Sequence, residues 1–293
     1  MSFNKNKINS DGSINLYKYT GEDLNEYSDD TQTILNAESD KIRICFLDTE
    51  TTGVNREKDY VIEIALKCIE INKITGDELR VITGYESLHD PGIPIPPEST
   101  KIHEITDKDV KGHSIDWDKV SEILNISQLI VAHNASFDRP FVEKNCEISK
   151  RKIWACSVQD IDWLERGFKN KKQELLCIWH GFYYGSHRAM IDVDALIHLV
   201  NNPLYKDRKP ILELIENARK SWVKVYASNS KIEDKDILKE NNYRWDPGQK
   251  VWHKTITNSD IDDERMWLND NIYNGNFSGK FIEILPVDKY KNN

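Results

Sequence analysis

Two acidic side chains follow an apolar run in the stretch FLDTETTG, residues 46–53. The run, residues 42–47, is interrupted only by an arginine and is followed by Asp48 and Glu50, with one threonine between them. Because side chains alternate between the two faces of a β-strand, residues i and i+2 point the same way. The two carboxylates would therefore lie side by side and repel each other. Either they are solvated at the end of a strand, or a cation lies between them.

A third acidic residue, Asp138, lies in the segment AHNASFDRPF. A strand is predicted to end early in this segment, and Asn134 or Ser136 can cap the helix that follows. Pro140 is expected in the first turn of that helix, where a missing N–H costs little. Asp138 would then lie near the carboxyl edge of the sheet. Taken alone, it is explained as an acid that the helix dipole favours.

A fourth acidic residue lies in HRAMIDVDALIHLV, whose periodicity predicts a helix. One stripe of this helix contains Asp192 together with alanine and leucine side chains, and it should face the sheet. A carboxylate in that position needs a partner or a metal ion. Asp194 lies about 200° around the helix, where we expect it to be solvated and paired with His198. His187 precedes the helix by about one turn, where a lone histidine is more often structural than catalytic.

These segments together supply four carboxylates, Asp48, Glu50, Asp138 and Asp192, and one histidine, His187. Oxygen ligands of this kind suit Mg²⁺ or Mn²⁺ and suit Zn²⁺ much less. Acidic side chains that cluster without thiolates are typical of a two-metal site, in which ions about 4 Å apart clamp an in-line displacement at phosphorus. Cations would also relieve the repulsion between the first two carboxylates. The sequence therefore predicts a site for two divalent ions.

The elements that must position these residues follow the pattern of an α/β layer. PGIPIPPEST (91–100) contains four prolines and is expected to be a fixed loop rather than a helix or central strand. A helix is predicted around residues 116–124 and a buried strand over 128–134, after which strand and helix alternate to about residue 202. Three earlier segments are expected to form an antiparallel meander of strands: 41–50, 60–71 and 78–88.

Outside residues 41–202, which form this layer, the chain divides into three further parts. Residues 1–40 are polar and rich in Asn, Asp and Ser, and they are predicted to be a flexible extension. Residues 203–220 are predicted to be a linker with some helix. Residues 221–293 are predicted to be a small α+β domain, in which RWDPGQKVWHK (244–254) forms a hairpin that turns at Asp-Pro-Gly.

The predicted C-terminal domain interleaves aromatic and basic side chains. Exposed rings beside cations are typical of single-strand binding, but a small domain also needs large rings for its core. Most of the rings are expected in the core, while Lys250, Lys254 and one tryptophan form a strip that holds longer substrates. The aromatic residues are Trp222, Tyr226, Tyr243, Trp245, Trp252, Trp267 and Tyr273, and the basic ones are Lys224, Arg244, Lys250, His253 and Lys254.

The composition argues against several classes of protein. Of the 293 residues, 30% are charged and 39% are hydrophobic, as in globular proteins of one large or two modest domains. We expect neither a signal peptide nor a membrane span, because no suitable apolar stretch occurs. Five cysteines without a CxxC pair favour reduced thiols in a cytoplasm. The net charge of −9 argues against indiscriminate nucleic-acid binding, although a local basic groove is compatible with it.

Three of these segments resemble motifs of the DEDD-type 3′–5′ exonucleases, in the branch that uses a histidine. The motif D-x-E-T-T-G is matched by residues 48–53, H-N-A-x-F-D by residues 133–138, and H-x4-D by His187 and Asp192. The resemblance covers roughly residues 41–202. It extends to epsilon-subunit-like and exodeoxyribonuclease X-like enzymes, including a bacterial stand-alone group with an extra C-terminal domain. It implies a ribonuclease H-like α/β fold, with a mixed sheet flanked by helices, and a small C-terminal α+β module.

The resemblance also implies roles for the acidic residues and the histidine. Asp48 would bridge two Mg²⁺ ions, for which Mn²⁺ can substitute. Glu50 and Asp192 would complete the tighter metal site, and Asp138 would act on the second ion. His187 would be the general base that deprotonates the attacking water, a task that suits imidazole at neutral pH.

A further motif, P-E-x4-H, is matched by Glu98 and His103, which would contact the terminal nucleotide. The family usually has glycine after that histidine, whereas this chain has Glu104, so the backbone there is expected to differ. The residues expected to bind substrate are Thr51, Thr52, Glu98, His103, Asn134 and His187.

The predicted activity is the release of nucleoside 5′-monophosphates from the 3′ end of DNA, with a single strand as the favoured substrate and a role in repair or processing. An oligoribonuclease-like enzyme that acts on short RNA is an alternative, because the motifs do not determine whether the site accommodates a 2′-hydroxyl. An inactive binding module would be expected to lack a motif acid, and none is lost. A proofreading subunit would need a polymerase-binding tail, whereas the C-terminal segment of this chain is expected to be a folded domain. Association with a polymerase is therefore possible but not indicated.

Overall fold

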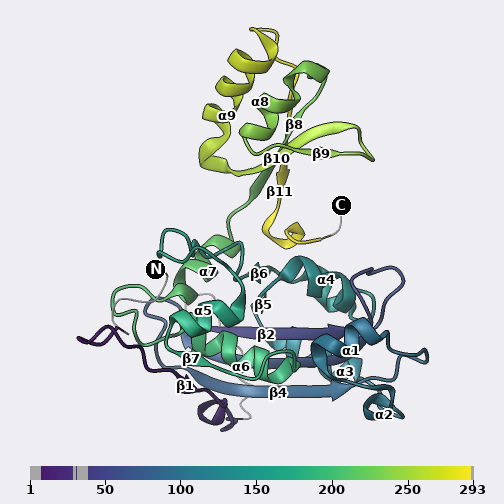
Figure 1. Cartoon of the computed structure of the whole chain (residues 1–293), viewed down its shortest axis with the longest axis vertical. Helices are drawn as coiled ribbons and strands as arrows, with labels where there is room; N and C mark the ends of the chain where they lie inside the picture. Colours follow the sequence, from purple (N-terminus) through teal and green to yellow (C-terminus); the bar gives the residue numbers. More distant parts are fainter. Residues whose placement is uncertain (1–7, 29–30, 32–38, 292–293) are drawn as a thin grey trace. The chain divides into compact units, whose positions relative to one another are not determined.

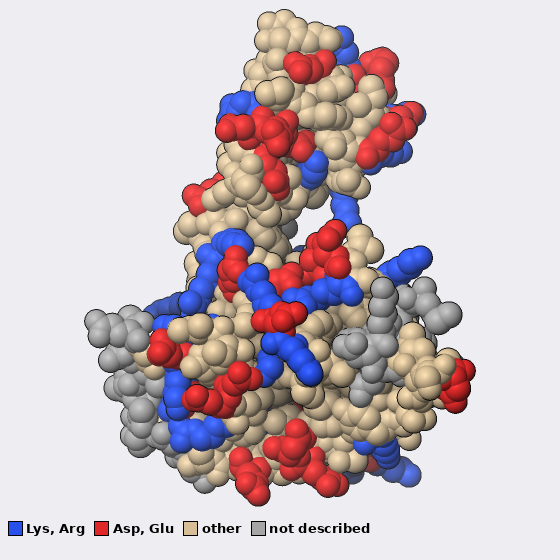
Figure 2. Space-filling model, turned by 90° about the vertical axis from the view of Figure 1, so that its left-hand side faces the viewer, with Lys and Arg blue, Asp and Glu red and all other residues tan. Residues whose placement is uncertain are grey.

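The computed structural model of the protein describes residues 8–28, 31 and 39–291. The chain forms two compact units (Figure 1). Unit 1 comprises Met1–Ala218 with Tyr290–Asn293, and unit 2 comprises Arg219–Lys289. None of the described helices has the length and apolar character that crossing a membrane requires. Basic and acidic side chains lie interspersed over unit 1 on the side drawn in Figure 2.

Unit 1 is built on a mixed five-stranded sheet in the order β4-β3-β2-β5-β6. β2, β3 and β4 pair antiparallel, whereas β5 pairs in parallel with β2, and β6 with β5. β3 is buried along almost its whole length, so both faces of the sheet are covered there. The antiparallel meander and the α/β fold class predicted from sequence are confirmed. The strands are β2 (Lys41–Thr51), β3 (Val61–Asn72), β4 (Arg80–Leu88), β5 (Leu129–Ala132) and β6 (Trp154–Cys156).

Helices flank this sheet (Figure 1). α6 packs on β2 and β3, α4 packs on β2, β5 and β6, and α7 packs on β6. Asp116 caps α3 by accepting hydrogen bonds from the backbone N–H groups of Asp118 and Lys119. The helices of unit 1 are α1 (Pro97–His103), α2 (Asp107–Val110), α3 (Trp117–Ile126), α4 (Ala135–Glu143), α5 (Gln173–Trp179), α6 (Ala189–Val200) and α7 (Pro210–Ala218).

Two predictions about prolines are wrong. Residues 97–100 are helical, because Pro97 occupies the first position of α1, where its fixed φ suits a helix and its missing N–H is not needed. Pro140 lies beyond the first turn of α4, in the helix interior rather than at its start. The prolines at residues 91, 94 and 96 precede α1, as expected of a loop.

The described part of the N-terminal segment packs on the core of unit 1. β1 (Tyr17–Lys18) pairs in parallel with β7 (Phe182–Tyr183). Tyr19 and Leu24 are buried among the core side chains. The flexible extension predicted for residues 1–40 is therefore wrong around these residues, because apolar side chains in a polar stretch have a core to enter. Residues 1–7, 29–30 and 32–38 of that prediction lie outside the described residues.

The same segment explains why the prediction for Asp194 is wrong. Asp194 is buried, and its Oδ1 accepts a hydrogen bond from Nζ of Lys67 on β3. Gly21 lies against the other carboxylate oxygen, with φ +73°, where a Cβ atom would come within 2.4 Å. The N-terminal segment thus excludes water from Asp194. His198, its expected partner, lies 2.6 Å from the hydroxyl of Tyr17 instead.

Unit 1 extends beyond the predicted end of the α/β layer at residue 202. α7 (Pro210–Ala218) lies in the stretch expected to be a linker, and it buries Ile211, Leu214 and Ile215 in the core. Tyr290 returns to unit 1, where its hydroxyl donates to Oδ2 of Asp160. All five cysteines are buried and free, as expected of reduced thiols.

Unit 2 contains an antiparallel four-stranded sheet in the order β11-β8-β10-β9. The predicted hairpin is confirmed: β9 and β10 pair, and the Oδ1 atom of Asp246 accepts 2.9 Å hydrogen bonds from the N–H groups of Gly248 and Gln249. The elements are β8 (Trp222–Ala227), α8 (Lys235–Glu240), β9 (Arg244–Asp246), β10 (Val251–Thr257), α9 (Ile261–Leu268) and β11 (Lys280–Ile284).

Candidate active site

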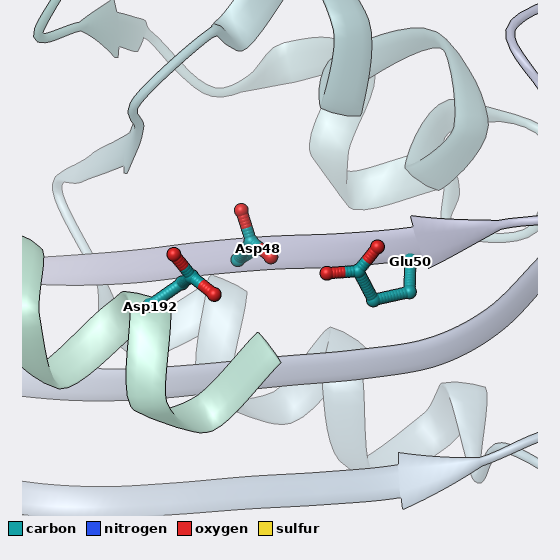
Figure 3. A group of neighbouring side chains, drawn as sticks. All are labelled: Asp48, Glu50 and Asp192. Carbon is teal, nitrogen blue, oxygen red and sulfur yellow. The ribbon is translucent and has the colours of Figure 1, made fainter. Parts of the chain in front are cut away.

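Three of the four predicted acids converge where α6 begins above β2. Asp48 and Glu50 come from the end of β2, and Asp192 comes from the first turn of α6. One carboxylate oxygen from each lies within 4.8 Å of those of the other two (Figure 3). All three side chains are half-buried. The alternation of the strand therefore places two acids on one face, and packing of α6 on β2 adds the third.

Asp192 is held by four hydrogen-bond donors. Its Oδ2 atom accepts from the backbone N–H groups of His187, at 2.8 Å, and Arg188, at 3.2 Å. Its Oδ1 atom accepts from the hydroxyl of Tyr184, at 2.9 Å, and from Nε2 of Gln173, at 3.4 Å. Asp192 thus has a fixed direction before any ion binds. Neither Tyr184 nor Gln173 was predicted from the sequence, because no spacing links them to Asp192.

The three carboxyls are protonated more readily than usual. Burial, together with the charges of Asp138, Asp192 and Glu50, holds the pKa of Asp48 well above its ordinary value. Burial, and then Asp192 and Glu63, raise the pKa of Glu50 to about 8. Burial also raises the pKa of Asp192. Unshielded acids at this distance repel one another, and a set of carboxylate oxygens without thiolates fits a hard divalent cation.

Asp138 is buried in the first turn of α4 and faces Thr49 of β2. Its Oδ1 atom accepts from the hydroxyl of Thr49, at 2.8 Å, and from the Thr49 N–H, at 3.1 Å. Burial raises the pKa of Asp138 to about 7, against the lowering effect of these hydrogen bonds. Asp138 is not one of the three acids whose oxygens come within 4.8 Å of one another. Its charge still raises the pKa of Asp48, so it belongs to the same electrostatic site.

His187 lies directly before α6, with its ring on the surface. Its side chain is 47% exposed, and its Nε2 atom lies 3.9 Å from a carboxylate oxygen of Glu174. The backbone has φ +67°, a left-handed conformation that is uncommon for residues other than glycine. The N–H of His187, rather than its ring, is bound to Asp192. The ring is therefore accessible at the surface beside the start of α6.

A fifth carboxylate, Glu63, lies opposite Glu50 in the pairing of β2 with β3. It is buried, and Arg188 donates to it from Nη2 at 2.8 Å and from Nε at 3.1 Å. The N–H of Ala189 adds a third hydrogen bond, at 3.0 Å. Glu63 is therefore charge-compensated and ties the start of α6 to β3. Glu63 was not predicted as a site residue, although a glutamate inside an apolar strand is a signal for a buried partner.

The predicted substrate-binding residues of α1 lie in different environments. Glu98 is exposed in the first turn. His103 is buried; its Nδ1 atom accepts from the N–H of Ile105 at 3.0 Å, and burial lowers its pKa. Its Nε2 atom is also buried and has no hydrogen-bond partner among the described residues. Glu104 ends the helix with φ +61°, in the left-handed region where glycine is favoured.

The predicted threonine hydroxyls are used within the loop that follows β2. The Thr51 hydroxyl donates to the carbonyl of Gly53 at 2.6 Å. The Thr52 hydroxyl donates to Asp59 at 3.2 Å and accepts from the N–H of Tyr60 at 3.0 Å. Asn134, in contrast, is exposed at the N-cap position of α4, where its side chain makes no capping hydrogen bond. Its amide is accessible at the carboxyl edge of the sheet.

Comparison with known proteins gives concordant matches. A family model described as Exonuclease (RNase_T) matches residues 45–200. The DNA polymerase III subunit epsilon of Treponema pallidum is 25% identical over 202 residues, which cover 66% of this chain and 91% of that protein. The same subunit of Buchnera aphidicola is 32% identical over 166 residues, 51% of this chain and 68% of that protein. A solved exonuclease X in complex with 5′ overhanging duplex DNA is 22% identical, with a TM-score of 0.40, over 58% of this chain and 99% of that chain.

Proposed function

Because this chain belongs to the exonuclease family, as a DEDD-type 3′–5′ exonuclease with a ribonuclease H-like fold, we propose that it shortens DNA from the 3′ end and releases nucleoside 5′-monophosphates. The observation that carries this proposal is the convergence of Asp48, Glu50 and Asp192, with carboxylate oxygens within 4.8 Å of one another. Their pKa values, raised by burial and by the charges of neighbouring carboxylates, support a site for cations.

Enzymes of this family use divalent metal ions, and the acidic cluster fits them. We propose that two Mg²⁺ ions, or Mn²⁺ in their place, are held by Asp48, Glu50, Asp192 and Asp138. Such ions, when bound, polarise the phosphate and favour a hydroxide nucleophile. Asp138, which accepts a hydrogen bond from Thr49, would act on the second ion. The hydroxyl of Tyr184 would keep the carboxylate of Asp192 directed at the cluster.

Other side chains around the cluster would transfer the proton of the attacking water and bind the terminal nucleotide. His187 takes the proton of the attacking water, because its ring is exposed and its backbone N–H is bound to Asp192, an acid of the cluster. Asn134 and Glu98 lie on the surface, where they can bind the terminal nucleotide. His103 offers a buried Nε2 atom without a partner among the described residues, which a substrate hydroxyl or phosphate can satisfy. Thr51 and Thr52 shape the loop, and their backbone would contact the nucleotide.

The favoured substrate is a single strand of DNA, and the favoured role is repair or processing in the cytoplasm. Five buried cysteines that form no disulfide support that compartment. A proofreading subunit is the second candidate, because two similar proteins are DNA polymerase III epsilon subunits. The first of these alignments covers 66% of this chain, so part of the chain has no counterpart in it. Addition of a replicative polymerase would stimulate the nuclease on a mismatched primer end only if the second candidate is correct.

The proposed function is tested with 5′-labelled strands of identical sequence, as DNA and RNA, single-stranded and duplex. In Mg²⁺, the DNA strand should give a ladder that shortens from the 3′ end, with nucleoside 5′-monophosphates as the released product. Chelation and Asp192→Asn should each abolish the ladder, whereas Asp118→Asn, at an exposed position of α3, should not. Shortening of RNA alone, shortening from the 5′ end, or full activity of Asp192→Asn would overturn the assignment.

A further inference from the structure

The sheet of unit 2 has one face that the helices of that unit cover and one that they do not. Alternate residues of β8 are buried, namely Val223, Val225 and Ala227, and they form a core with side chains of α8 and α9. The intervening residues of β8 are half-buried and point to the other face. We call this second surface the open face. Its members are Trp222, Lys224 and Tyr226 of β8, the residues of β10 and β11 paired with them, and Arg244 and Asp246 of β9, whose partners lie on the same face of β10.

The register of the strands places one row of side chains across the whole open face. Tyr226 is paired with Lys280 of β11 on one side and with His253 of β10 on the other. His253 is in turn paired with Arg244 of β9. The row therefore reads Lys280, Tyr226, His253, Arg244, with a cation at each edge of the sheet and two rings between them. Paired strands are about 4.8 Å apart, so the row spans roughly 14 Å.

Lys224 adds a third cation beside this row. It lies two residues before Tyr226 on the same face, and its Nζ atom is 5.4 Å from the centre of the Tyr226 ring. The rings of Tyr226 and His253 lie with centres 6.3 Å apart. Burial, and then the charges of Lys224 and Arg244, lower the pKa of His253 despite the opposing effect of Asp246. The Nδ1 atom of His253 is buried, and within the described residues it has no hydrogen-bond partner.

The two faces of unit 2 differ in their balance of charge. Asp246 is the acid on the open face, and its Oδ1 atom is engaged by the turn that follows. In the helical segments that cover the other face, acids outnumber Lys231, Lys235, Lys239 and Arg265, and Figure 2 shows acidic and basic side chains together over unit 2. These acids are Glu233, Asp234, Asp236, Glu240, Asp260, Asp262, Asp263, Glu264 and Asp270. The open face is therefore basic in a chain whose net charge is −9.

The side chains of unit 2 that can contact a ligand differ from those predicted from the sequence. Trp252 and Lys254 point to the covered face, where Trp252 is buried and Lys254 is bound to Glu264 at 2.6 Å. The predicted strip of Lys250, Lys254 and one tryptophan is therefore wrong, because the face of β10 that carries Trp252 and Lys254 is the one that the helices cover. Most of the predicted aromatic residues do contribute to the core of the unit: Tyr243, Trp252 and Tyr273 are buried, and Trp267 packs against them.

We propose that the open face of unit 2 binds a single-stranded nucleic acid. Bases stack on Tyr226 and His253, and phosphates lie at Lys280, Arg244 and Lys224. Rings offer a stacking surface to any base, and flanking cations follow a phosphate backbone, so this arrangement suits binding without sequence preference. The proposal concerns binding and does not depend on which acids cut the strand.

The test uses the full chain with a chelator present, so that no strand is hydrolysed. Fluorescence anisotropy measures the affinity for a labelled 30-nucleotide DNA strand and for the same sequence in RNA. Lys280→Glu with Arg244→Glu should weaken binding at least tenfold. The slope of log affinity against log salt should fall by about 1.4, since each lost phosphate contact removes about 0.7. Tyr226→Ala should weaken binding by about fivefold or more, and Tyr226→Phe should restore it, because stacking needs the ring and not the hydroxyl.

Lys231→Glu with Lys235→Glu is the matched control, because it changes the net charge equally at exposed positions outside the open face. This control should bind both strands like the parent. Cleavage of a trinucleotide in Mg²⁺ should be unchanged in all these variants, which separates loss of strand binding from loss of the nuclease. Parental affinity in Tyr226→Ala and in the double variant would overturn the proposal and leave the open face to a protein partner. Equal loss in the control would also overturn it.

Discussion

Lys67 of β3 and Asp194 of α6 form a buried ion pair with an N–O distance of 2.5 Å. Burial raises the pKa of Asp194 to about 6, and the ammonium group of Lys67 opposes that rise. The pair links α6 to the strand beside β2, and Asp192 lies two residues before Asp194 along the same helix. An interaction that touches no substrate therefore helps to hold the helix that carries an acid of the site.

Replacement of Lys67 by methionine should destabilise the protein, because Asp194 would lose its partner in a place that water does not reach. The expected loss in the free energy of unfolding is roughly 3–5 kcal/mol, measured by urea denaturation. The double variant Lys67→Met with Asp194→Leu should recover most of it. Arg208→Met, which breaks the exposed pair with Glu216, should cost less than about 1 kcal/mol. An equal loss in Arg208→Met and Lys67→Met would contradict the role assigned to burial.

Tyr184→Phe should weaken metal binding without unfolding the protein. The variant removes the 2.9 Å hydrogen bond that directs Oδ1 of Asp192 and changes no charge. The Mg²⁺ concentration for half-maximal cleavage should rise by roughly 10–100-fold, as for other groups that orient metal ligands. Tyr183→Phe, at the exposed neighbouring position, is the control and should leave the Mg²⁺ dependence unchanged. A Tyr184→Phe enzyme with the parental Mg²⁺ dependence would show that Asp192 needs no help from this hydroxyl.

His187→Ala should lower the turnover number by roughly 10²–10⁴-fold, the usual contribution of a general base. The acidic limb of the pH–rate profile should weaken with it, and the thermal midpoint should change little, because the ring is on the surface. His113→Ala, at another exposed histidine, should leave both the rate and the profile as they are. A pH–rate profile that keeps its acidic limb in His187→Ala would assign that limb to another group.

Without divalent ions, the protein should lose stability as the pH rises from 7 to 8.5. Glu50 has a pKa of about 8 when folded and an ordinary value of 4.5, so the folded state holds more protons in this range than the unfolded chain. The free energy of unfolding therefore falls with rising pH. Asp138, with a pKa of about 7, acts in the same direction. His133 and His180, lowered to about 4 by burial, act in the opposite direction only at lower pH, where the unfolded chain gains their protons.

Urea denaturation at several pH values in a chelating buffer measures this dependence. Glu50→Gln should flatten the slope, because one of the groups that bind a proton on folding is removed. Saturating Mg²⁺ should flatten it in the parent, because a bound cation replaces the protons. Glu98→Gln, at an exposed position, should keep the parental slope. If Glu50→Gln keeps the parental dependence of unfolding free energy on pH, a group other than Glu50 takes up the proton on folding.

The sequence was informative wherever a contact is local. The alternation of β2 alone puts Asp48 and Glu50 on one face, and the apolar runs predict the meander that carries them. The turn chemistry of Asp246 is likewise contained within a few residues, and the hairpin follows from it. These features depend on backbone geometry with a fixed period, so a pattern in the sequence is sufficient to predict them.

Tertiary structure decided the features that depend on what packs against an element. Helical periodicity placed Asp194 on a solvated face, yet Lys67 and the N-terminal segment at Gly21 bury it. Asp138 matches its motif, but only the packing of α4 on β2 turns it toward Thr49. The aromatic residues of unit 2 could each have taken either face of a strand, and the pairing register alone sent Trp252 inward and Tyr226 outward. A shift of one residue in register would exchange the two faces, which is why the sequence by itself leaves them undecided.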